Sequence, residues 1–117
     1  IKRKETTMPN IDISALLTNM LSAAKEPLLQ KWSETSGYAE SEFKKIGEAI
    51  LFIEKQRLIG KMTEEQAKLH LEMQKNASRA ILLTIEGLGI LAVEAAINAA
   101  LSVIRDAVNT ALKFPLI

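Results

Sequence analysis

Apolar residues recur every three or four positions along most of the chain, which is the spacing of one face of an α-helix. The repeat is present before residue 34, from residue 38 to residue 59, and again from residue 64 onward. A helix with one apolar face buries that face against other helices. The pattern therefore predicts an all-α fold, an antiparallel bundle of about four helices.

The first predicted helix begins at Asn10 or Asp12, because either side chain can accept hydrogen bonds from the free amides of a helix start. Pro27 predicts a kink or a restart at Glu26, because proline has no amide hydrogen and its ring crowds the preceding turn. The helix is expected to continue to about Glu34, and Thr35-Ser36-Gly37 to break the chain.

A second helix is expected over residues 38–59, ended by Gly60, which suits the left-handed conformation beyond a helix end. Thr63 and Gln66 match a capping box, in which each side chain bonds the backbone amide of the other residue. The third helix is therefore predicted to start at Glu64 and to form a hairpin with the second.

The third helix carries a charged stripe on one side: Glu65, Lys68, Glu72, Lys75, Arg79 and, if the helix continues, Glu86. The apolar side changes at Gly87-Leu88-Gly89, where two glycines permit either a kink or a reversal. No Ser, Thr or Asp directly follows Gly89 to cap a new helix. This favours one long helix kinked at residues 87–89 over a hairpin.

The last predicted helix has two apolar sides. One side carries large residues, Ile90, Ile97, Leu101, Ile104 and Val108, and the tail adds Phe114. The other carries small ones, Ala92, Ala96, Ala99, Val103, Ala107 and Ala111. A second copy would cover both sides more easily than one chain, so we expect a homo-oligomer, with a dimer favoured, and take the large residues as its candidate interface.

Glu94 and Asn98 head a narrow polar stripe within this apolar region. Three interpretations remain open: a solvated or interface stripe, a buried polar pair that sets the register of an oligomer, or a small-molecule or metal carboxylate site that also recruits Glu48. The acids oppose insertion into lipid, so a membrane span is not expected. A membrane-active protein remains an alternative.

The chain has 117 residues, of which 48% are apolar, 25% charged and 4% aromatic, the balance of one globular domain. We expect a flexible arm at residues 1–9, a helical domain at 10–114 and an apolar tail at 115–117. The net charge of +1 gives no reason to expect nucleic acid as a partner, since Lys2-Arg3-Lys4 is the one dense basic cluster. The sequence has no cysteine, which is compatible with the cytoplasm, the expected location.

No catalytic set is recognisable in the sequence. His70 is the single histidine, and Ala67 stands where a Glu-x-x-His metal motif needs glutamate. Trp32 and Tyr38 are interpreted as packing residues. We therefore expect no enzyme activity and no cofactor, and favour a non-catalytic oligomerisation or partner-binding module, such as a small adaptor or structural component.

Overall fold

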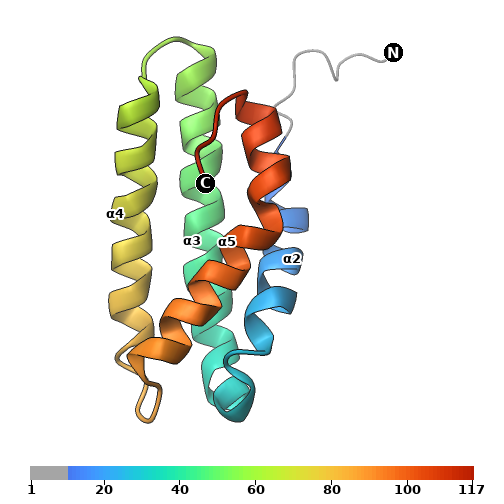
Figure 1. Cartoon of the computed structure of the whole chain (residues 1–117), viewed down its shortest axis with the longest axis vertical. Helices are drawn as coiled ribbons and strands as arrows, with labels where there is room; N and C mark the ends of the chain where they lie inside the picture. The colour runs from blue at the N-terminus through green and yellow to red at the C-terminus, as the bar shows by residue number, and fades with distance from the viewer. Residues whose placement is uncertain (1–10) are drawn as a thin grey trace.

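The computed structural model describes residues 11–117, which form four α-helices and no strand (Figure 1). The elements are α2 (Ile13–Lys25), a short 3-10 helix η1 (Leu29–Lys31), α3 (Trp32–Leu58), α4 (Glu64–Leu82) and α5 (Ile90–Leu112). The predicted all-α bundle of about four helices is confirmed. The arm predicted at residues 1–9 and the alternative cap Asn10 lie outside the described residues.

Helix α2 is capped at its start by Asp12, whose carboxylate accepts hydrogen bonds from the Ser14 amide at 3.0 Å and the Ala15 amide at 3.4 Å. The helix ends at Lys25, two residues before Pro27. Glu26 still has helical dihedral angles, with φ −64° and ψ −50°, and the helix ends just before Pro27, which has no amide hydrogen to donate.

The chain turns back at residues 26–31, and α3 runs without a break through Thr35-Ser36-Gly37. The predicted break at residues 35–37 is therefore wrong. Thr35 and Ala39 are both fully buried on the inner side of α3, so packing outweighs the weak helix preference of the intervening Ser and Gly. Leu28, buried within the turn, fixes the true position of the reversal.

The hairpin between α3 and α4 follows the local sequence signals. Gly60 has a φ of 73°, in the left-handed region. The Gln66 amide donates to the Thr63 hydroxyl at 3.0 Å, and the Thr63 amide donates to the Gln66 side chain at 2.9 Å. The capping box and the start of α4 at Glu64 are both confirmed.

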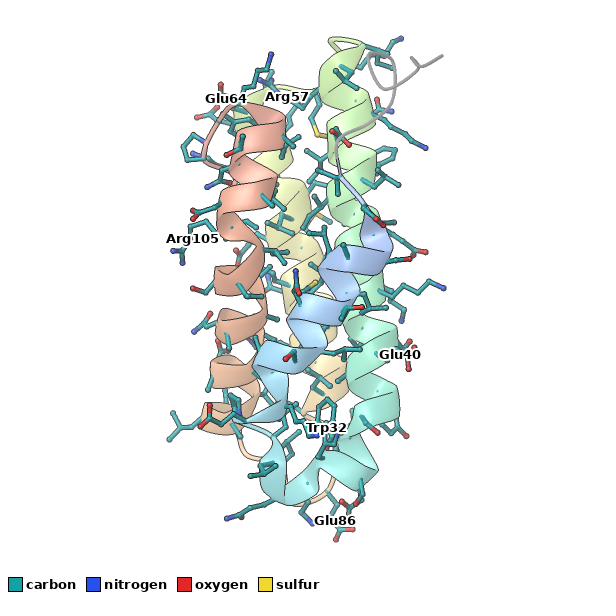
Figure 2. The ribbon with its side chains drawn as sticks, turned by 90° about the vertical axis from the view of Figure 1, so that its right-hand side faces the viewer. Trp32, Glu40, Arg57, Glu64, Glu86 and Arg105 are labelled. Carbon is teal, nitrogen blue, oxygen red and sulfur yellow. The ribbon has the colours of Figure 1, made fainter. Side chains whose placement is uncertain are left out.

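The junction between α4 and α5 is a reversal. Helix α4 ends at Leu82, Gly87 has a φ of 84°, and α5 starts at Ile90 and runs back across the bundle (Figure 1). The favoured long helix kinked at residues 87–89 is therefore wrong, and the hairpin is the correct alternative. Glu86, expected on the stripe of α4, instead lies exposed in the turn at the end of the bundle (Figure 2).

The bundle consists of two helix pairs. Helix α5 packs mainly against α2, and α4 packs mainly against α3. The contact between α2 and α3 joins these two pairs. Fully buried side chains fill the space between them: Met20, Leu28, Phe43, Ile46, Ile50, Ile53, Leu82, Val93, Ile97, Ile104 and Val108. Each side chain of this size contributes about 1.5–3 kcal/mol when it is removed from water.

The segment after α5 folds back onto the bundle. Lys113 ends the helix with a φ of 65°. The Asn109 side chain then donates to the Ile117 carbonyl at 3.3 Å and accepts from the Ile117 amide at 3.0 Å. Because Phe114 and Leu116 are buried, this segment is part of the core.

Candidate functional site

Glu94 is held by an arginine from the neighbouring helix. The Arg79 side chain of α4 donates to both carboxylate oxygens of Glu94 on α5, with the Arg79 Nη2 to Glu94 Oε1 distance at 3.4 Å, and also donates to Asn76. The Glu94 side chain is 35% exposed. The Glu94 carboxylate therefore joins α4 to α5. This contact was not predicted, because the sequence pattern placed Arg79 on a solvated stripe.

Within one chain Asn98 is exposed on α5 and Glu94 is half-buried, and the polar pair buried in an oligomer stays a prediction. Glu48, the third residue of the carboxylate site, is exposed on α3. Among residues 11–117, no group of three or more acidic or histidine side chains is placed to hold a metal ion.

The large apolar side of α5 lies in the core of the chain itself. Ile97, Leu101, Ile104 and Val108 are buried, as is Phe114 of the tail, whereas Ile90 is 56% exposed. The candidate interface is therefore corrected: α2 covers the side that the sequence assigned to a second copy. A periodic apolar pattern does not distinguish a partner within the chain from one outside it.

His70 and the two other aromatic candidates have packing positions. The His70 ring stacks on Phe52 of α3, with ring centroids 5.1 Å apart. Trp32 is half-buried against the core and Tyr38 is exposed. Tyr38 lines a surface hollow together with Lys31, Glu34 and Glu86.

Arg57 lies at the end of the bundle where α3 and α4 are joined, close to Glu64 and far from Glu86 (Figure 2). Its guanidinium donates to the Met62 carbonyl at 2.9 Å, lies 3.7 Å from a Glu64 oxygen, and sits 4.8 Å from the centre of the Phe114 ring. It therefore holds the α3–α4 loop and the final segment together. The sequence pattern gave no signal for this role.

A hollow of about 320 Å³ opens between η1 and the α4–α5 turn. It is lined by apolar residues such as Leu29 and Ala92 and by the polar Glu26 and Lys31. The Lys31 side chain lies against Gly87, where an added Cβ would be 2.8 Å from Lys31 Cε. Beside this end, the Ser33 hydroxyl donates to Glu34 at 3.0 Å and lowers the pKa of that fully exposed carboxyl.

Charge is distributed unevenly between the two helix pairs. The exposed positions of α3 and α4 include many charged residues: Glu34, Glu40, Lys44, Lys45, Glu48, Lys55, Glu64, Glu65, Lys68 and Glu72. In α2 the residues from Ile13 to Ala24 include no charge at all. In α5 the charged residues are Glu94, Arg105 and Asp106, and Glu94 is bonded to α4.

The outer side of α2 and α5 therefore carries few charges. The uncharged face is the set of its exposed residues without charge, Ser14, Ala15, Thr18, Asn19, Ser22, Ala95, Asn98, Ser102, Val103, Ala107 and Thr110. Helix α5 also exposes Ile90, Leu91, Arg105 and Asp106. Of the small side predicted for α5, Ala96 is buried and Val103 and Ala107 are exposed on this face. The contribution of α2 was missed, although its run without charge is visible in the sequence.

Exposed surfaces of soluble proteins are normally rich in Lys and Glu, whereas the centres of protein interfaces are depleted of charge. The uncharged face shares this low charge, whereas large exposed apolar side chains such as Phe52, Leu69 and Met73 lie on α3 and α4. None of the helices within residues 11–117 has both the length and the apolarity required to cross a membrane.

Comparison of the chain with protein-family models, with curated proteins and with solved structures gives no match.

Proposed function

We propose that this chain is a non-catalytic helical module that acts by binding another protein surface through its uncharged face. The observation that carries the proposal is the separation of charge between the helix pairs. The exposed side of α3 and α4 is dense in Lys and Glu. The exposed side of α2 and α5 is built mainly from Ser, Thr, Asn and Ala, and its exposed charged residues within the two helices are Lys25, Arg105 and Asp106. Covering the uncharged face desolvates no ion, and its hydroxyl and amide groups can form hydrogen bonds to the partner.

The positions of the polar side chains support a binding role over a reaction. Glu94 is occupied by Arg79, His70 is stacked on Phe52, and Arg57 bonds the α3–α4 loop. These groups stabilise the fold and do not converge on one point. The two helices that form the proposed docking face, α2 and α5, are each other's main packing neighbours.

The test introduces a positive charge at Val103, which is 50% exposed at the centre of the uncharged face. Val103→Lys is compared with Leu69→Lys, which places the same charge at a 62% exposed apolar position on α4. The native chain and both variants are produced in the cells from which the sequence comes, and chemical cross-linking then measures complexes heavier than one chain.

We expect the cross-linked complexes to be lost in Val103→Lys and kept in Leu69→Lys. Circular dichroism confirms that both variants remain helical. Complexes that persist equally in both variants, or that are absent with the native chain, would show that the uncharged face is not a binding surface.

A further inference from the structure

We infer that the surface on which residues 114–117 lie is a binding site for extended peptides, and that this segment is its intramolecular occupant. We call this surface, which includes Arg57 and Asn109, the tail site. The partner that fits it is a protein presenting an exposed stretch of an aromatic residue, a proline and two aliphatic residues. The inference is independent of the proposed function, because residues 114–117 are not part of the uncharged face.

The tail site lies where α3 and α5 both end. Arg57 is in the last turn of α3 and Asn109 is in the last turn of α5. Figure 1 shows the segment leaving the end of α5 and turning back over α3. Residues 114–117 are not helical, although the Phe114 and Leu116 side chains are buried in the core. A non-helical segment therefore completes this end of an otherwise helical core.

Asn109 binds the backbone of the segment and no side chain. Its amide group donates to the Ile117 carbonyl at 3.3 Å and accepts from the Ile117 amide at 3.0 Å. Every residue except proline offers the same backbone donor and acceptor. This contact therefore requires a suitably placed main chain but no particular residue, which is how peptide-binding domains obtain affinity from the main chain.

Two buried positions supply the selection of side chains. The Arg57 guanidinium lies 4.8 Å from the centre of the Phe114 ring, a cation–π contact that favours an aromatic residue. Arg57 is also bonded to the Met62 carbonyl at 2.9 Å, so the α3–α4 loop helps to hold the guanidinium in place. Leu116 occupies the second buried position, which favours an aliphatic residue.

The segment has a turn that prepares it for docking. The Leu116 amide donates to the Phe114 carbonyl at 2.9 Å, which closes a tight turn at Pro115. Because the proline ring fixes φ, a segment with this turn loses fewer conformations when it docks. Only four residues have to move to vacate the site, so opening costs less free energy than unfolding the helices. A partner's peptide can therefore replace the segment while the bundle stays folded.

The test weakens the segment in the full chain and then supplies it as a free peptide. Phe114→Ala removes the buried ring, and the probe is a fluorescent peptide Lys-Phe-Pro-Leu-Ile blocked at both ends. By fluorescence anisotropy, we expect Phe114→Ala to bind the peptide at least about tenfold tighter than the native chain does. The reason is that the native segment competes for the site at an effective concentration of about 1 mM.

A second peptide and two further variants locate the binding. Lys-Ala-Pro-Leu-Ile lacks the ring and should bind Phe114→Ala at least about tenfold more weakly. Adding Asn109→Ala to Phe114→Ala removes two backbone bonds and should weaken peptide binding about tenfold. Adding Asn98→Ala instead replaces an exposed asparagine elsewhere on α5, and this matched control should leave peptide binding unchanged.

Circular dichroism checks that each variant is folded, and Leu116→Ala replaces Phe114→Ala if the latter fails to fold. A folded variant that binds no peptide up to about 1 mM would overturn the inference, because the segment itself docks at that effective concentration. Equal effects of Asn109→Ala and Asn98→Ala would also overturn it. In the native chain the segment occupies the tail site, so the cross-linking comparison of Val103→Lys with Leu69→Lys tests the uncharged face separately.

Discussion

Arg79 and Glu94 form an ion pair between α4 and α5, two helices that separate beyond this point (Figure 1). The Arg79 side chain is 24% exposed and that of Glu94 35%. Because α4 packs mainly on α3 and α5 mainly on α2, this pair is one of the few direct links between α4 and α5.

Glu94→Gln is therefore expected to lower the free energy of unfolding by about 1 kcal/mol, since it removes one charge from a half-buried, doubly bonded pair. Urea denaturation followed by circular dichroism measures the change. Glu86→Gln, in the exposed turn, is the matched control and should change stability by less than about 0.5 kcal/mol. In a double-mutant cycle with Arg79→Gln, a coupling energy near zero would contradict the structural role given to Glu94.

Ile97 lies on the core side of α5, and Leu91 lies on its exposed side. Ile97 is fully buried, so Ile97→Ala should cost about 2–5 kcal/mol of stability. Leu91 is 83% exposed, and Leu91→Ala should change stability by less than about 0.5 kcal/mol. The loss of unfolding free energy in Ile97→Ala should be the same at low and high protein concentration. A cost that grew with concentration would mean that Ile97 contacts another copy.

Three glycines offer a set of matched substitutions. Gly87 combines a φ of 84° with the nearby Lys31 side chain, Gly60 has a φ of 73° with open space around it, and Gly37 lies inside α3 with no atom within 4 Å of an added Cβ. Gly37→Ala should stabilise the chain by about 0.5–1 kcal/mol, because alanine favours the helix.

Gly60→Ala and Gly87→Ala should each destabilise the chain by about 1 kcal/mol or more, because alanine resists a positive φ. Gly87→Ala is expected to cost more, and the additional substitution Lys31→Ala should remove the excess. Thermal unfolding at one protein concentration ranks the variants. Equal losses at positions 60 and 87 would show that the Lys31 side chain moves aside without cost.

Local signals in the sequence were sufficient to predict where several helices begin or end. Asp12, Gly60 and the Thr63–Gln66 box act through bonds to their own neighbouring backbone, so their effect can be predicted without knowing the rest of the fold. Thr35 shows the limit of this approach. Its burial depends on helices distant in the sequence, and that burial kept α3 intact where the local residues predicted a break.

The reversal before α5 could not be decided from the sequence because α5 starts without a side-chain cap: Gly89 precedes it and makes no side-chain bond. The error over the interface has the same origin. Once α5 turns back, Ile97 and Leu101 reach α2, and the exposed side of α5 becomes the small-residue side. The candidate site therefore depended on one turn that the sequence left open.

The pairing of α2 with α5 has a consequence during synthesis. The ribosome releases residues 13–25 long before residues 90–112, yet α5 is the main packing neighbour of α2, whose Leu16 and Met20 are buried. A nascent chain interrupted before Ile90 leaves these side chains in water, where chaperones and proteases recognise them. The fold is thus completed only when the last helix is translated, and truncated products should be degraded quickly.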